Sequence, residues 1–245
     1  MSHFNEKVRW ALDYKGVPHV RKALVPGPHI PRLLWLSRQK QVPILVLHDE
    51  VIVGSAEIIH ALERVYPDPP LYPAEAGERQ RALEIARFLD DDLGPTVRLA
   101  FFHELLPHTA ICAELFGQGL SAPARALYRL AFPGIRAIMR RDMKIDARTA
   151  QEAFEKTLVV LSRLDNLIQP GSYLVGTSFS VADLTAAALL SPVVCPPEFP
   201  YPLPAASEPF VRFRERIGHE RVCEWCRFIY AKHRGRSSEV RRPQA

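Results

Sequence analysis

The chain begins with apolar residues at the spacing of an α-helix. These residues are Phe4, Val8, Ala11 and Leu12, and Gly16 marks the end of the pattern. Residues 19–25 are β-leaning, and a cluster of prolines ends that run. The pattern therefore predicts a helix at the N-terminus followed by a strand, with no strand in front of the helix.

Two further strands and a second helix are predicted next. Residues 42–53 are rich in Val, Ile and Leu and contain a polar turn, His48-Asp49-Glu50, as a hairpin does. From Ser55 onwards the apolar residues return to helical spacing. Residues 66–73 contain four prolines, so we interpret this segment as a linker between two domains.

Beyond residue 74, helical periods replace the strand patterns almost throughout the chain. One long helix is predicted around residues 83–97, and a helix with almost no polar face begins at Val181. The sequence therefore predicts the α+β class, with a small α/β domain followed by an all-helical domain. The predicted boundaries are 1–73 for the first domain, 74–235 for the second and 236–245 for a disordered basic tail.

The start of the buried helix carries a capping box. With Ser180 as the N-cap, Asp183 falls at N3, where each side chain can bond the backbone amide of the other residue. Phe179 and Leu184 are placed to pack as a hydrophobic staple. A buried helix needs this cap because its first amides cannot reach water. We expect Ser180 and Asp183 to be structural.

Composition excludes several function classes. The chain is 47% hydrophobic and 24% charged, which is ordinary for a globular protein. It has no apolar run of about 18 residues and no signal-peptide pattern, so we expect no membrane partner. Four cysteines in 245 residues do not form a disulfide framework, which favours the cytoplasm.

Charged and thiol clusters suggest no further chemistry. The net charge of +5 comes partly from residues 233–245, which hold four arginines and one glutamate. A basic arm for nucleic acid is the alternative to a disordered tail, but no aromatic residue or recognition motif supports it. Cys223 and Cys226 form a C-x-x-C without a second ligand pair, and Asp90-Asp91-Asp92 reads as a solvated acidic turn. No metal is predicted.

Four segments together resemble the cytosolic glutathione transferase family, in its serine-type, zeta- or theta-like bacterial form. In chain order they are SHFNEKVRWAL, KQVPILVL, GSAEIIHALE and FSVADLT. They are similar to the family's serine active-site segment, its cis-proline loop, its second helix start and its capping box. The resemblance implies a thioredoxin-like domain that binds glutathione and a helical domain that holds the second substrate.

The resemblance also implies the site residues. Ser2 matches the catalytic serine, whose hydroxyl would donate to the glutathione thiolate; a free thiol, with a pKa of about 8.5, is mostly protonated at neutral pH. Val42 and a cis Pro43 would pair with the cysteinyl part, and Gln41 would contact the glycyl half. Ser55 would bind the γ-glutamyl carboxylate at a helix N-terminus. From the residues alone, both serines are also ordinary N-caps.

The chain departs from the family in two places. Gly54 stands where the family usually has the Glu, Asp or Gln that meets the γ-glutamyl ammonium. The family's first strand, which would precede Ser2, is missing, so we expect an in-frame strand-forming segment upstream of Met1. Burying about four apolar residues of such a strand would contribute roughly 6–12 kcal/mol.

The leading hypothesis is a glutathione transferase that activates the thiol of glutathione for attack on a hydrophobic, electrophilic small molecule. The resemblance implies a homodimer with no metal. The alternative is a non-catalytic binding or interaction protein on the same fold. Gly54 and the missing strand favour this alternative.

Overall fold

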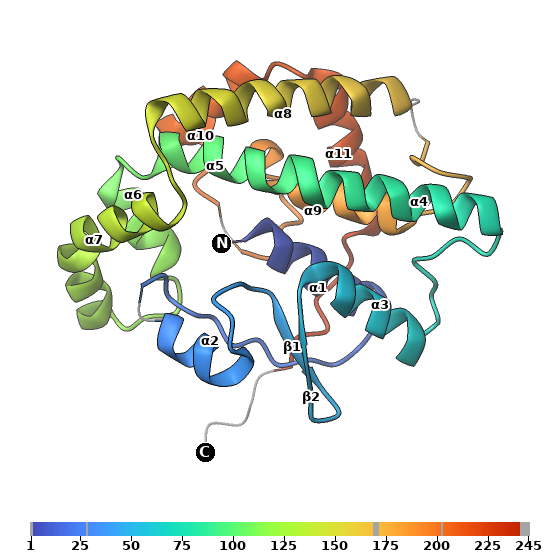
Figure 1. Cartoon of the computed structure of the whole chain (residues 1–245), viewed down its shortest axis with the longest axis horizontal. Helices are drawn as coiled ribbons and strands as arrows, with labels where there is room; N and C mark the ends of the chain where they lie inside the picture. The colour runs from blue at the N-terminus through green and yellow to red at the C-terminus, as the bar shows by residue number, and fades with distance from the viewer. Residues whose placement is uncertain (1, 28, 169–171, 202, 241–245) are drawn as a thin grey trace.

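The computed structural model describes residues 2–27, 29–168, 172–201 and 203–240. A small N-terminal unit packs against a larger set of helices (Figure 1). The N-terminal elements are α1 (His3–Tyr14), α2 (Ile30–Ser37), β1 (Ile44–Leu47), β2 (Glu50–Val53) and α3 (Ser55–Val65). The helices that follow are α4 (Ala76–Phe88), the π-helical turn η1 (Leu89–Leu93), α5 (Gly94–Leu105), α6 (Thr109–Phe116), α7 (Ala122–Asp142), α8 (Ala147–Leu167), α9 (Val181–Val194), α10 (Glu208–Ile217) and α11 (Glu220–His233). The α+β class is confirmed.

The predicted hairpin forms between residues 44 and 53. β1 and β2 pair in antiparallel register, with Ile44 opposite Val53. His48 and Asp49 have φ values of 47° and 66°, as the tight two-residue turns between antiparallel strands require. The hairpin is followed at once by α3, so its end fixes where that helix begins.

The strand predicted over residues 19–25 does not form. In the part of the chain that the structure describes, strand pairing in this segment is confined to His19, which forms a parallel bridge with Glu239. A strand needs a neighbouring backbone for each N–H and C=O group. Here that neighbour reaches His19 alone, and Val20 is 43% exposed. A β-leaning composition was not sufficient without a partner strand.

The long helix predicted around residues 83–97 forms, with a π-helical turn inside it. α4, η1 and α5 follow one another without a break, and η1 contains the three consecutive aspartates. Asp90 is not solvated as expected, because it accepts a 2.5 Å hydrogen bond from the Lys7 ammonium, whose side chain is 1% exposed. The π turn thus supplies the counter-charge for a buried amine of α1.

The buried helix α9 confirms the predicted capping box. The Ser180 amide donates to Asp183 Oδ2 at 2.9 Å, and the Ser180 side chain caps the first amides of the helix. The Leu174 amide also donates to Asp183, at 2.7 Å to Oδ1. Burial raises the pKa of Asp183 to about 6, although these hydrogen bonds oppose the shift. The cap therefore joins α9 to the loop that precedes it.

α1 packs between α3 and α9, and its charged residues Glu6, Lys7 and Asp13 are buried. Trp10 contacts the rings of Phe179 and Tyr230, at centroid distances of 5.8 and 4.4 Å. Lys15 pairs with Glu63 of α3 at 2.5 Å and donates to backbone carbonyls of the predicted linker. Both units therefore hold α1 by polar contacts as well as by apolar packing. The domain boundary at residue 73 stays a prediction.

The predicted disordered tail is ordered over residues 236–240. Ser237 Oγ and the Ser238 amide both donate to Asp13 of α1, and Glu239 forms the bridge to His19. The prediction rested on charge alone, whereas an acidic partner on α1 is available to this segment. Residues 241–245 lie outside the described residues.

Candidate functional site

Ser2 is the N-cap of α1. Its Oγ accepts a hydrogen bond from the Asn5 amide at 3.4 Å, as an N-cap serine does. A serine hydroxyl can accept and donate at once, so this contact leaves the Ser2 proton free to bond a further group. The N-terminus of α1 also carries a partial positive charge that favours an anion. The capping role and the proposed thiolate contact are therefore compatible.

His3, which sequence reasoning missed, lies beside Ser2. Its side chain is 3% exposed, and burial, with the nearby charge of Arg98, lowers its pKa to about 3. The imidazole is therefore neutral at physiological pH. It hydrogen-bonds the Gly94 backbone at the start of α5. One signal in the sequence could have pointed to His3: it directly follows the N-cap serine, in a helix that carries other buried charges.

Gly94 lets α5 approach the first turn of α1. A Cβ atom on this residue would lie 2.3 Å from the ring of Phe4, far inside van der Waals contact. The start of α5 therefore sits directly on the first turn of α1 and limits where Ser2 can lie.

The proline loop and the start of α3 meet beside the hairpin. The Val42–Pro43 peptide bond is cis, as the resemblance implies. Pro43 is buried, and its carbonyl accepts a hydrogen bond from the Gly54 amide at 3.1 Å. Gln41 is exposed and Val42 is half-buried. The structure therefore places Gln41, Val42 and Pro43 close to the N-terminus of α3.

Ser55 is the first residue of α3, and Gly54 is its N-cap. The reading of Ser55 as a plain N-cap is therefore wrong by one position. Ser55 is 7% exposed, and its amide belongs to the first turn, where helix amides lack an intrahelical partner. A carboxylate placed there would meet amide donors and the positive end of the helix dipole.

The structure brings these residues together in part. α1 packs on α3, and the Gly54–Pro43 hydrogen bond joins the proline loop to α3. Among the described residues, no hydrogen bond or ion pair joins Ser2 to Pro43 or Ser55. A ligand spanning the site would have to bridge Ser2 on α1 and the start of α3.

The backbone explains the glycine at position 54. Gly54 has a φ of 94° and a ψ of 140°, a conformation that glycine adopts far more easily than other residues. No heavy atom lies within 4 Å of the position a Cβ would occupy. The constraint here is therefore conformational and not steric.

Gly54→Ala should lower the free energy of unfolding by about 1–3 kcal/mol, because alanine must adopt this strained conformation. Chemical denaturation measures the loss. Gly134→Ala is the control, since Gly134 lies in α7 with open space around it, and the change should stabilise by about 0.5–1 kcal/mol. Equal effects at the two positions would contradict the conformational explanation.

Other candidate chemistry finds no support in the described ranges. No group of three His, Cys, Asp or Glu side chains there could hold a metal ion. Cys223 and Cys226 are both free, and burial raises the pKa of each thiol, which disfavours the reactive thiolate. Across the same residues, no helix is both long and apolar enough to cross a bilayer.

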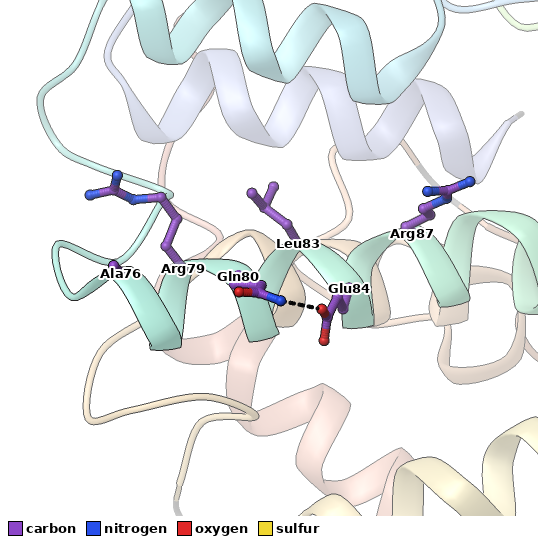
Figure 2. A pocket seen from close by; sticks show the side chains of 6 residues that line it. All are labelled: Ala76, Arg79, Gln80, Leu83, Glu84 and Arg87. Atoms are coloured by element: carbon purple, nitrogen blue, oxygen red, sulfur yellow. Dashed lines mark hydrogen bonds between the residues drawn. The ribbon is translucent and has the colours of Figure 1, made fainter.

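A hollow lies on the outer face of α4, apart from these residues (Figure 2). Its lining residues are Ala76, Arg79, Gln80, Leu83, Glu84 and Arg87. Gln80 donates to Glu84 at 2.9 Å, and Leu83 is 39% exposed between the two arginines. None of the predicted site residues belongs to α4, so this hollow is a separate surface.

Comparison with known proteins matches both halves of the chain. Residues 1–70 match the family model for the N-terminal domain of glutathione S-transferases, and residues 127–220 match the model for the C-terminal domain. Maleylpyruvate isomerase of Ralstonia sp is 36% identical over 94 residues, which are 37% of this chain and 44% of that protein. The chain thus spans less than half the length of the curated relatives it matches first.

Solved structures share the fold. The β-etherase LigF of Sphingobium sp. strain SYK-6 aligns with a TM-score of 0.63 and 22% identity, covering 94% of this chain and 91% of that one. A glutathione S-transferase of Methylobacterium radiotolerans, in complex with glutathione sulfonate, aligns with a TM-score of 0.54 and 20% identity, covering 91% and 89%. The N-terminal unit is therefore thioredoxin-like, with a two-stranded sheet among the described residues, and the helical unit is of the same type as in these proteins.

Proposed function

The chain belongs to the glutathione S-transferase family, and on this premise we propose that it activates the thiol of glutathione for attack on a hydrophobic, electrophilic small molecule. The reaction is a conjugation or a related glutathione-dependent isomerisation. The bound glutathione sulfonate of the Methylobacterium neighbour and the isomerase name of the Ralstonia relative support this reaction class.

The observation that carries the proposal is the position of Ser2. Its hydroxyl accepts from the Asn5 amide and still has a proton to donate, at the positive end of α1. A donor hydrogen bond to the glutathione sulfur favours the thiolate over the thiol and so lowers the thiol pKa. The thiolate then attacks the electrophile held beside it, so that activation and proximity together give the rate.

The remaining site residues would hold the rest of glutathione. The Val42 backbone, next to the cis Pro43, would pair with the cysteinyl part, and Gln41 would contact the glycyl half. The first amides of α3, with Ser55, would bind the γ-glutamyl carboxylate. Binding at both ends would place the sulfur against Ser2.

Ser2→Ala should reduce kcat/KM for glutathione conjugation of an aryl halide by about 10- to 100-fold, the usual value of a hydrogen bond to a charged group. The pKa of the bound thiol should rise, so activity should appear at higher pH than in the parent protein. Steady-state kinetics across the pH range and calorimetric titration with glutathione measure both effects.

Ser121→Ala is the control, because Ser121 is also a helix N-cap, on α7, although its side chain makes no capping hydrogen bond. We expect this variant to keep the parent pH profile and activity. An unchanged profile in Ser2→Ala would overturn the catalytic role of Ser2.

The alternative function is a non-catalytic binding protein on the same fold. Gly54 supports it, because glycine has no side chain to meet the γ-glutamyl ammonium. Calorimetry with the parent protein separates the two functions: no binding at glutathione concentrations of about 1 mM would sink the enzyme hypothesis.

We also propose a cytoplasmic homodimer. The four cysteines are free in the structure, which fits a reducing compartment. The hollow on α4, with exposed Leu83 beside opposite charges, is the candidate face for a second copy (Figure 2). Light scattering of the parent protein and of Leu83→Glu tests this arrangement.

A further inference from the structure

We propose that the C-terminal segment, residues 234–240, positions α1 and thereby sets the place of the Ser2 hydroxyl. The inference rests on the proposed role of Ser2 in thiol activation. This segment would then help to hold the site, although among the described residues no hydrogen bond or ion pair joins it to Ser2 or to the proline loop.

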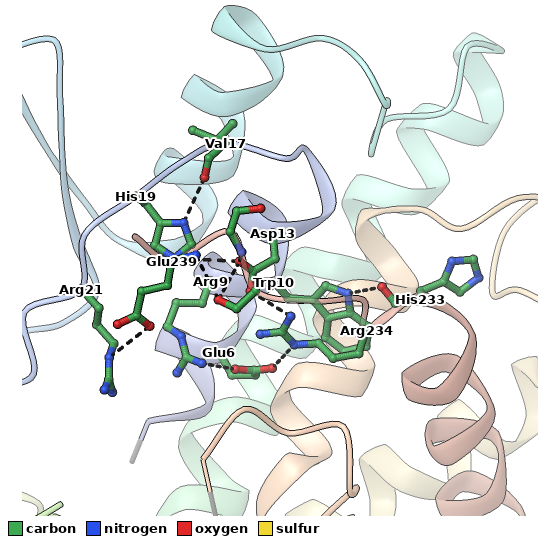
Figure 3. Close-up of polar contacts among 12 residues, drawn as sticks. Glu6, Arg9, Trp10, Asp13, Val17, His19, Arg21, His233, Arg234 and Glu239 are labelled. Carbon is green, nitrogen blue, oxygen red and sulfur yellow. Dashed lines mark hydrogen bonds and ion pairs between the residues drawn. The ribbon is translucent and has the colours of Figure 1, made fainter. Parts of the chain in front are cut away.

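A buried ion cluster ties the start of this segment to α1 (Figure 3). Arg234 Nε donates to Glu6 Oε1 at 2.7 Å, and its Nη1 lies 2.8 Å from Asp13 Oδ2. All three side chains are at most 1% exposed. Because Glu6 and Asp13 are two helical turns apart on one face, a single guanidinium fixes both the rotation and the height of α1.

Trp10, which lies between Glu6 and Asp13 in α1, adds a hydrogen bond and a cation–π contact to the end of α11 and the residue after it. Its Nε1 donates to the His233 carbonyl at 3.1 Å, and the Arg234 guanidinium lies 5.7 Å from its ring centroid (Figure 3). The indole ring is fully buried. The end of α11 and the segment after it therefore contact the middle of α1.

The backbone beyond Arg234 continues along the same helix. The Ser238 amide and Ser237 Oγ donate to Asp13 Oδ1 at 2.7 and 3.1 Å. The His19 amide donates to the Ser238 carbonyl at 3.3 Å, and the Val240 amide donates to the His19 carbonyl at 2.8 Å. The segment therefore binds both α1 and the chain that follows it.

Glu239 fixes the far end of the segment. It accepts a 2.8 Å hydrogen bond from the Tyr201 hydroxyl and lies 3.6 Å from Arg21 Nε. The guanidinium groups of Arg9 and Arg21 lie over the Tyr201 ring, at 4.1 and 3.8 Å from its centroid. Arg9 belongs to α1, so this contact adds a second route from the segment to the helix.

These contacts reach the first turn of α1. The Glu6 amide bonds the Ser2 carbonyl at 3.0 Å, so the residue held by Arg234 is also hydrogen-bonded to the N-cap. A helix of 12 residues moves as a stiff unit. A shift of α1 at Glu6 or Asp13 therefore moves the Ser2 hydroxyl relative to the start of α3.

The pair Ser238→Pro and Ser238→Ala tests the proposal in the full chain. Proline removes the amide that donates to Asp13, whereas alanine keeps it. We expect Ser238→Pro to speed hydrogen exchange of the α1 amides by about tenfold, the value of one bond to a charged group, with α9 amides unaffected. Its conjugation activity should fall and its pH profile should move to higher pH, because Ser2 no longer meets the thiol. Ser238→Ala should match the parent protein in both readouts.

Two results would overturn the proposal: unchanged α1 exchange in Ser238→Pro, or faster α1 exchange with the parent pH profile. If Ser238→Pro does not fold, Ser237→Ala replaces it with the same readouts, because it removes the 3.1 Å bond to Asp13 together with the bond that the Glu239 amide donates to Ser237 Oγ. If the parent protein neither binds nor conjugates glutathione, the proposed function fails. The hydrogen-exchange result then still tests the structural part: faster exchange of the α1 amides in Ser238→Pro would show that the segment holds the helix, and unchanged exchange would show that it does not.

Discussion

Arg234→Met should lower the free energy of unfolding by about 3–5 kcal/mol, the usual cost of removing one partner from a buried ion cluster. Glu6 and Asp13 would remain at most 1% exposed without their guanidinium. Methionine keeps most of the volume but offers neither carboxylate a donor. Thermal unfolding should begin roughly 10 °C lower than in the parent protein.

The pH dependence of the same variant gives a second readout. Burial raises the pKa of Glu6, while the charge and hydrogen bond of Arg234 hold it down. Without Arg234 this pKa should rise further above its value of about 4.3 in the unfolded chain. A carboxyl group whose pKa is higher in the folded state loses stability as pH rises between the two values. The deficit of Arg234→Met should therefore be larger at neutral pH than at a pH of about 4.

The control is Arg212→Met, which removes an exposed pair with Glu208 on α10. Such pairs contribute about 0.5 kcal/mol or less. Adding Glu6→Gln to Arg234→Met should recover part of the loss, so the double variant should be less destabilised than the sum of the single ones. A loss below about 1 kcal/mol in Arg234→Met would contradict the cluster's role in stability.

Features that depend on neighbouring residues were predictable from the sequence. The Ser180–Asp183 capping box and the turn at His48-Asp49 are formed within a few residues, and both appear as expected. The cis bond at Pro43 was expected from the family resemblance and not from local physics. The order of a small α/β unit followed by a helical unit was also predictable, because the spacing of the apolar residues becomes helical beyond residue 74.

Contacts between distant segments were not predictable in this way. Arg234 pairs with Glu6 across 228 positions, and Lys7 pairs with Asp90 across 83. From the sequence, Asp90 was placed in a solvated acidic turn, and Arg234 was counted among the charges of the basic stretch at residues 233–245. The available signal was in α1 itself, a helix that carries Glu6, Lys7, Arg9 and Asp13 beside a large apolar surface. Such a helix can be buried only if other segments supply the opposite charges.

α1 is accordingly the helix at which buried ion pairs from three other parts of the chain meet. η1 supplies Asp90 for Lys7, α3 supplies Glu63 for Lys15, and the C-terminal segment supplies Arg234 for Glu6 and Asp13. Each partner comes from a different part of the chain. We infer that these pairs fix the rotation of α1, because any turn of the helix would leave a buried charge without its partner.

Asp183→Ala should lower the free energy of unfolding by about 3–5 kcal/mol, because the buried amides of Leu174 and Ser180 both lose their acceptor. These bonds are 2.7 and 2.9 Å long, and Asp183 is fully buried. Alanine also leaves the first turn of α9 without its capping box. Denaturant unfolding measures the loss, and exchange of the Leu174 and Ser180 amides should speed up most.

Asp146→Ala is the matched control, because Asp146 and Thr149 form the same capping box at the exposed start of α8. Water can bond the amides that lose Asp146 as acceptor, so the loss of stability in Asp146→Ala should be a small fraction of that in Asp183→Ala.

The pH dependence of stability separates the two variants further. Burial raises the pKa of Asp183 to about 6, above its unfolded value, so the parent protein loses stability as pH rises from about 4 to about 6. Asp183→Ala lacks this response, whereas Asp146→Ala keeps it. Equal losses in the two variants would show that burial adds nothing to the cap.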